Sequence, residues 1–318
     1  MQAETEPSPI TVDEFLSNAE RHLASFPPDV DSAKHIFDKA LRLFPENPDI
    51  LAAYGEFHCE AGDAIRAVEL LQKSIDVEPN KNAARYFYLG QLQSGKDACP
   101  TFKKGIQIIH AEIKNETTDL DFAKKQLSSA YCALAELYMT DLCDESNAEE
   151  ECIKYFEAAL KENENSVEAH HCKALYNKVI GDLDVALEEA KKCLALLKSI
   201  ERGSIPSIEI RTNLSRTLID LNETTSAISL LESCLAEDEE DMQVWYVLSC
   251  AHMITGNLED ALDCTQKASD CLKSSELYGD ASCSLNYEIP ALIKEIQKRQ
   301  ASSQTSFDTS MANTSARN

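Results

Sequence analysis

Small and bulky side chains recur along this chain at a fixed period. The repeat that starts at Pro48 has its pattern residues at Leu51, Tyr54, Gly55, Gly62, Ala67, Leu71 and Pro79. A repeat that starts at Met242 uses the same offsets, with Trp245, Leu248, Gly256 and Ala261. Repeats of this length cannot bury their apolar faces singly, so they stack on their neighbours and share one continuous core.

The offsets resemble those of the tetratricopeptide repeat (TPR), a pair of antiparallel helices that spans about 34 residues. Small residues inside each repeat would let its two helices approach closely, and the closing proline would end the second helix. Further repeats begin at Val167 and Ile208. We therefore predict an all-α, superhelical TPR solenoid of about seven helix pairs over residues 10–273. A generic array of helical hairpins is the alternative.

The two ends of the chain lack this periodicity. Residues 1–9 are featureless, and the polar stretch 301–318 has no helical period, so we predict that both are disordered. Just before the tail, the stretch from Tyr287 to Gln300 is amphipathic and predicts one more helix, which caps the apolar face of the last repeat. The solenoid with its capping helix is thus expected to span residues 10–300.

The charge of the chain limits its partners. It carries 55 Asp and Glu residues against 30 Lys and Arg residues, a formal net charge of −25. Phosphate backbones and anionic membranes would be repelled, so we expect no direct contact with nucleic acid or membrane. The first residues lack the basic and apolar segments of a secretory signal, and the 12 Cys residues form no CxxC pair. We therefore expect reduced thiols and a location in the cytoplasm and nucleus.

Common catalytic patterns are missing from the sequence. The chain has no GxxxxGKS, GxxxxGKT, HExxH or GxSxG motif. His170 and His171 are adjacent, so on a helix their side chains diverge by about 100° and do not chelate one metal together. We expect a protein that is not an enzyme and that has no catalytic residue, no metal and no cofactor.

In TPR arrays the first helix of each pair usually lines a concave groove. Carboxylates recur at the corresponding positions of this chain, with aromatic, amide and Met side chains between them. The predicted partner-binding residues are Glu56, Glu60, Phe87, Gln91, Glu136, Met139, Asp141, Glu168, Asp220 and Tyr246. Such a lining suits a long, basic, extended peptide, whereas it carries no basic cluster for the C-terminal carboxylate of a heat-shock chaperone. The alternative is that the acidic residues serve only solubility.

The central repeat carries a more specific pattern. The run AELYMTDLCDESNAEEEC at residues 135–152 resembles a signature of the dedicated assembly chaperones of the large-subunit ribosomal protein L-four. Its matching residues are Tyr138, Met139, Thr140, Asp141, Leu142, Ala148, Glu149 and Cys152. The runs YFYLGQL at 86–92 and VWYVLSCAHM at 244–253 agree as well, and the resemblance covers residues 12–272.

This resemblance implies a function. Members of the family bind newly made L-four, shield its long, basic internal loop, escort it into the nucleus and release it onto pre-ribosomes. By resemblance we expect this chain to bind L-four through that loop, one chain to one client. The alternative is an acidic TPR scaffold subunit inside a stable multiprotein complex.

Overall fold

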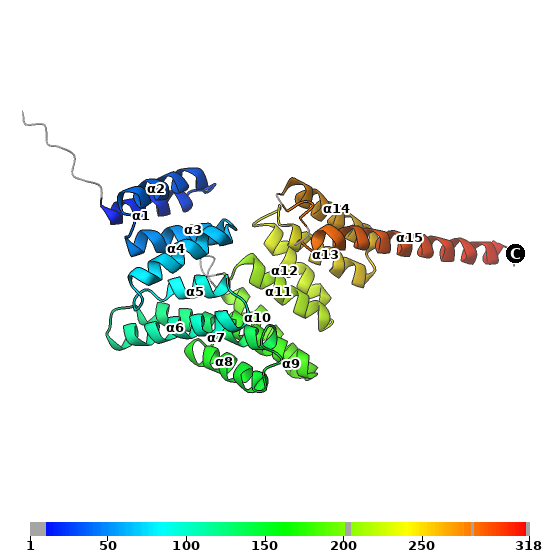
Figure 1. Ribbon diagram of the computed structural model, residues 1–318. Coiled ribbons are helices and arrows are strands. Elements are labelled where there is room, and N and C mark those ends of the chain that lie inside the picture. The colour runs from blue at the N-terminus through cyan, green and yellow to red at the C-terminus, as the bar shows by residue number, and fades with distance from the viewer. Residues whose placement is uncertain (1–10, 201–204, 276, 281–282, 316–318) are drawn as a thin grey trace, which may run out of the picture. The chain divides into compact units, whose positions relative to one another are not determined.

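The computed structural model describes residues 11–200, 205–275, 277–280 and 283–315, with side chains described up to residue 302. Within these ranges the chain is all-helical, with fifteen helices and no strand (Figure 1). None of the described helices combines the length and the apolar composition of a bilayer-spanning segment.

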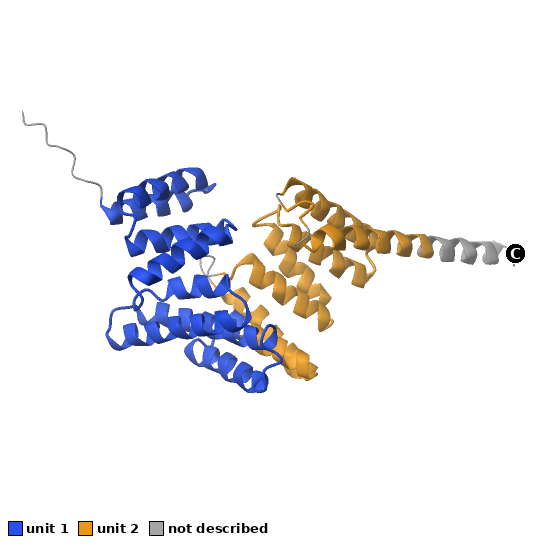
Figure 2. Ribbon diagram, viewed as in Figure 1, with its two compact units in different colours: residues 1–169 blue, residues 170–318 orange. Residues whose placement is uncertain are grey.

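The chain divides into two compact units, residues 1–169 and 170–318 (Figure 2). The helices of unit 1 are α1 (Val12–Leu23), α2 (Val30–Leu43), α3 (Pro48–Glu60), α4 (Ala64–Val77), α5 (Ala84–Gln91), α6 (Gly95–Lys114), α7 (Leu120–Met139) and α8 (Ala148–Glu162). After them come α9 (Val167–Ile180), which begins at the end of unit 1, and the helices of unit 2, which are α10 (Leu183–Ser199), α11 (Ile208–Asp220), α12 (Thr224–Leu235), α13 (Met242–Thr255), α14 (Leu258–Ser274) and α15 (Leu285–Ser315).

Helices α1 to α14 follow one another along the chain, and six adjacent pairs of them pack together. In unit 1, α1 packs with α2, α3 with α4, α5 with α6, and α7 with α8; in unit 2, α11 packs with α12 and α13 with α14. The four repeat starts read from the sequence, Pro48, Val167, Ile208 and Met242, are the first residues of α3, α9, α11 and α13. The prediction of an all-α TPR solenoid is confirmed.

Local chemistry explains these boundaries. The Asn47 side chain accepts hydrogen bonds from the backbone N–H groups of Asp49 and Ile50, both at 3.0 Å, and Pro48 occupies the first helical position. At the turn between α13 and α14, Gly256 has φ = 84°, a left-handed conformation that glycine adopts without strain. The glycine that the sequence pattern places between the two helices of a repeat, here Gly256, is therefore a turn residue.

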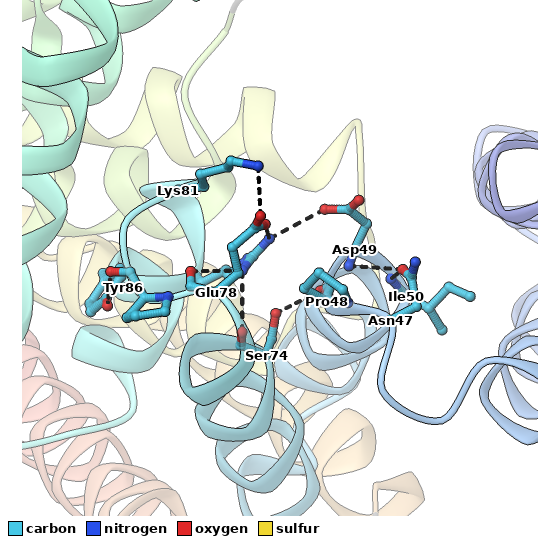
Figure 3. A network of polar contacts seen from close by, with 10 residues as sticks. Asn47, Pro48, Asp49, Ile50, Ser74, Glu78, Lys81 and Tyr86 are labelled. Carbon is cyan, nitrogen blue, oxygen red and sulfur yellow. Dashed lines mark hydrogen bonds and ion pairs between the residues drawn. The ribbon is translucent and has the colours of Figure 1, made fainter.

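A buried arginine ties three helices of unit 1 together. Arg85 of α5 is wholly buried, and its Nη2 atom lies 3.2 Å from Asp49 Oδ1 and 3.6 Å from Glu78 Oε2. Its Nη1 donates to the Ser74 carbonyl at 3.3 Å, while the Ser74 hydroxyl donates to the Pro48 carbonyl at 2.6 Å. Figure 3 shows Asp49, Ser74 and Glu78 converging on this point. The terminal nitrogens of the buried Arg85 guanidinium are thus paired and hydrogen-bonded, while its Nε has no hydrogen-bond partner among the described residues.

Unit 2 contains a second buried network. Glu189 of α10 is buried, with Oε2 2.6 Å from His170 Nδ1 and Oε1 2.9 Å from Lys173 Nζ. His171 points elsewhere, and its Nε2 lies 2.9 Å from the Thr217 hydroxyl of α11. The two adjacent histidines therefore contact different structural partners. Among the described residues, no group of His, Cys, Asp and Glu is arranged to hold a metal.

Helix α15 caps the array of unit 2. Leu285 and Ile289 pack with Ala268 and Leu272 of α14, and Gln300 Nε2 donates to the Leu258 carbonyl at 3.2 Å. The helix continues to Ser315, although the polar sequence predicts disorder from residue 301 onward. Residues 301–315 contain neither Gly nor Pro, so nothing interrupts a helix already anchored by its first turns. Residues 1–9 and 316–318 of the predicted disordered ends lie outside the described residues.

Candidate protein-binding site

The first helices of unit 1 carry most of the predicted binding residues. Glu56 and Glu60 lie on α3, and Phe87 and Gln91 lie on α5. Helices α3 and α5 are in contact although α4 separates them along the chain, and α1 contacts α3 in the same way. The structure thereby places residues from successive repeats on one surface, as expected for the first helices of TPR pairs.

Glu56 is the most perturbed carboxylate on this surface. Its side chain is half-buried, and no hydrogen bond or ion pair engages it within the described residues. Burial raises the pKa of Glu56 to about 7, the neighbouring charges of Glu60 and Glu20 add to the rise, and Arg85 opposes it. A carboxylate in this state lacks a counter-ion, which a cationic ligand would supply.

Tyr88 extends the acidic surface from α3 to α5. Burial raises the pKa of its hydroxyl to about 12, with further contributions from the carboxylates of Glu56 and Glu60 and from Cys59. We name Glu20, Glu56, Glu60 and Tyr88 the acidic surface of unit 1. Glu20 and Tyr88 are not among the binding residues predicted from the sequence. Glu20 belongs to α1, where the repeat pattern of a first helix is weak. Tyr88 lies next to the predicted Phe87 in a repeat whose pattern is degenerate.

Phe87 and Gln91 both line a pocket between α5, α6 and α7. Phe87 is half-buried and Gln91 is exposed, so each can reach a bound partner. The prediction that these two positions face a ligand stays a prediction, but the structure gives them a shared concave setting.

The end of α7 has a mainly structural environment. Asp141 Oδ2 accepts a hydrogen bond from the backbone N–H of Gly95 at 2.7 Å, which ties the loop after α7 to the start of α6. Tyr138 stacks on Tyr155 of α8 with ring centroids 5.8 Å apart, and its hydroxyl lies 3.7 Å from Cys99 Sγ. Within the YMTDL run, Tyr138 and Asp141 therefore hold α6, α7 and α8 together.

Glu136 and Met139 lie on the last turns of α7. The Glu136 side chain is exposed and that of Met139 is half-buried. The Glu136 carbonyl accepts the N–H of Thr140 at 2.9 Å, so its backbone ends the helix while its carboxylate faces outward. Contact of either side chain with a client stays a prediction.

Three predicted residues lie beyond these helices. Glu168 is half-buried near the start of α9, at the end of unit 1. Asp220 of unit 2 is paired with Lys178, with 2.6 Å between Oδ2 and Nζ. Tyr246 of unit 2 packs against the cluster formed with Leu285 and Ile289 of α15. Asp220 and Tyr246 thus already have partners within unit 2.

Comparisons with known proteins agree with the fold. A family model described as tetratricopeptide repeat matches residues 29–91. The chain is 30% identical over 205 residues to the probable assembly chaperone of rpl4 from Schizosaccharomyces pombe, covering 61% of this chain and 60% of that protein. It is 24% identical over 236 residues to the probable assembly chaperone of rpl4 from Emericella nidulans, covering 68% and 58%. The chain thus spans about 60% of the length of these curated relatives.

Solved structures show the same architecture. The assembly chaperone of RpL4 (Acl4, residues 1–338) aligns with a TM-score of 0.63 and 23% identity, covering 79% of this chain and 98% of that chain. Yeast Tom70 aligns with a TM-score of 0.55 and 15% identity, covering 95% and 67%. At these identities the solved structures establish the fold alone. The two curated relatives add similarity in sequence. The chain has the fold of a tetratricopeptide-repeat solenoid and is similar in sequence and fold to the assembly chaperones of rpl4.

Proposed function

We propose that this chain is a dedicated chaperone of the large-subunit ribosomal protein rpl4. It binds the newly made client, covers the client's basic extended loop with the acidic surface of unit 1, and delivers it to pre-ribosomes. Two curated relatives named as probable assembly chaperones of rpl4 support the identity of the client. No step of this function requires catalysis or a cofactor.

The half-buried Glu56 is the observation that carries the mode of binding. Its carboxylate lacks a counter-ion among the described residues and lies near Glu60 and Glu20, so a Lys or Arg of the client would relieve the repulsion. The guanidinium or ammonium group would also replace the water that burial has removed. Removing one partner of such a partly desolvated pair costs more affinity than removing one partner of a pair on the open surface, because the other charge is left without a partner.

The net charge of −25 suits the protection of a basic client. An unassembled basic loop binds RNA indiscriminately, because each cation that meets a phosphate releases a counter-ion. An acidic surface competes for the same cations and also accelerates the encounter. Ribosomal RNA is a denser polyanion, so it takes over the loop when the client reaches its assembly site. We place this cycle in the cytoplasm and nucleus, with one chain per client.

Binding of purified rpl4, with and without its internal loop, tests this function. We expect loop deletion to abolish most of the binding. We also expect raised salt to weaken the intact complex markedly, because charges are screened over about 10 Å at 0.1 M ionic strength. Glu56→Gln should weaken binding, whereas Asp144→Gln, at an exposed position in the loop after α7, serves as the charge-matched control.

Three outcomes would contradict the proposal or a part of it. Intact rpl4 that fails to bind would exclude it as the client. Binding that ignores both salt and the loop would leave rpl4 as the client but remove the acidic surface from the mechanism. A partner that instead stays bound at fixed stoichiometry after ribosome assembly would favour the scaffold alternative.

A further inference from the structure

A pocket of about 310 Å³ lies between α5, α6 and α7 of unit 1. Its lining includes Phe87, Tyr88, Gln91, Phe102, Ser129 and Ala133. Three aromatic rings thus share the wall with small and amide side chains, and none of these lining groups is a carboxylate. Such an interior favours a bulky apolar side chain over a cationic one, because a cation placed there would lose its hydration without a counter-ion.

Close packing of α5 against α6 fixes two of these rings. A Cβ atom on Gly105 would approach the Phe87 ring to 2.5 Å, and a Cβ atom on Gly90 would approach the Phe102 ring to 2.8 Å. The two glycines therefore give the rings room to stack, with centroids 6.3 Å apart and planes inclined by 20°. Rings held in this way lose little further freedom when a ligand arrives, so the pocket is largely preformed.

Opposite charges flank the pocket. Toward α3, Tyr88 borders the acidic surface, since the carboxylates of Glu56 and Glu60 act on its hydroxyl. On the α7 side, the pocket wall includes Lys125. A cationic side chain is attracted to the first side and repelled from the second, so a peptide that spans the pocket has one favoured order of residues.

We propose that this pocket holds one bulky apolar side chain, aromatic or long aliphatic, of an extended client segment in which a neighbouring Lys or Arg reaches Glu56. This rests on the proposed function, which supplies the client. The apolar side chain fixes the register of the segment, and the adjacent cation fixes its direction. Charge alone would let a basic loop slide along an acidic surface, whereas a filled pocket selects one segment of it.

Filling the pocket tests the proposal. Ser129 lines the pocket and is exposed, so Ser129→Phe would occupy the space without displacing a core side chain, and Ser129→Ala is its matched control. Full-length chain is titrated with purified rpl4 by calorimetry. We expect Ser129→Phe to weaken binding about tenfold or more and Ser129→Ala to change it by less than about twofold.

Crosslinking identifies the occupant directly. p-Benzoylphenylalanine in place of Gln91, an exposed residue of the lining, is photolysed in the complex with rpl4, and mass spectrometry locates the attachment. We expect attachment within about three residues of a bulky apolar side chain that has a Lys or Arg beside it. This measurement identifies the occupant of the pocket even if Ser129→Phe lowers the thermal stability of the chain.

The failures are distinguishable. If the unmodified chain binds rpl4 and Ser129→Phe binds it equally well, or if crosslinks fall on a segment without that pair of side chains, the pocket assignment is overturned and the proposed function stands. If the unmodified chain does not bind rpl4, the proposed function fails and the assignment of this pocket to rpl4 fails with it.

Discussion

Asp141 accepts a hydrogen bond from the backbone N–H of Gly95 at 2.7 Å, across the junction between two successive helix pairs. Gly95 has φ = 53° and starts α6, where the Ser94 side chain makes no capping bond. Asp141 therefore supplies from another repeat the anionic acceptor that a helix start prefers. The acidic residue of the YMTDL run has a structural role that its charge alone does not reveal.

Replacing Asp141 should therefore reduce stability more than it reduces binding. Asp141→Ala leaves the N–H of Gly95 without its partner, and we expect a loss of about 1 kcal/mol in the free energy of unfolding of unit 1. Asp144→Ala, in the same exposed loop, is the control and should change little. Thermal unfolding measures both. Unchanged melting together with strongly weakened rpl4 binding would instead make Asp141 a contact residue.

The repeat boundaries could be predicted because the TPR pattern is made of residues that pack in every copy. Gly55 illustrates this, since a Cβ atom there would approach Leu71 Cγ to 2.8 Å, so the position must remain small. The end of α15 could not be predicted in this way. Beyond residue 300 no apolar period marks the helix, and its continuation depends on the turns already packed against α14.

The candidate site was predicted only in part. Their positions within the repeat placed Glu56, Phe87 and Gln91 on the first helix of a pair, which faces the ligand in TPR proteins. The position of a charged residue within its repeat does not show whether it already forms an ion pair, because the ion-pair partner can come from another repeat. Asp220 is bound to Lys178 from two helices earlier, while Glu56 lacks such a partner among the described residues.

Arg85 should be among the side chains of unit 1 that tolerate replacement least. It is wholly buried and contacts Asp49, Ser74 and Glu78 from two other helices. Arg85→Ala removes these contacts and the packing of a wholly buried side chain, so we expect a loss of about 2–3 kcal/mol in the free energy of unfolding. Lys81→Ala deletes an exposed partner of Glu78 and should have no measurable effect. Urea unfolding compares the two variants, and similar midpoints would contradict the stabilising role of the buried network.

Glu56 should make unfolding depend on pH. Burial raises the pKa of Glu56 to about 7 in the folded chain, above the ordinary value of 4.5. The folded form therefore holds a proton that the unfolded form has lost, so stability falls as pH rises from about 4.5 to 7 and then levels off. Glu56→Gln removes this loss and should be more stable than the natural chain by up to about 3 kcal/mol at pH 8, with little difference near pH 4. Equal pH dependence in both chains would show that Glu56 ionises normally.

The same proton should link client binding to pH. A Lys or Arg of the client stabilises the ionised form of Glu56, so the pKa of Glu56 falls on binding and a proton is released. Affinity for rpl4 should then rise from pH 6 to pH 8, by up to about tenfold for each pH unit below 7. Calorimetry in two buffers of different ionisation enthalpy counts the released proton. Glu56→Gln should lose the proton release, while Glu60→Gln, at the exposed neighbouring carboxylate, should retain most of it. If the natural chain binds without releasing a proton near pH 7, the client's cation does not reach Glu56.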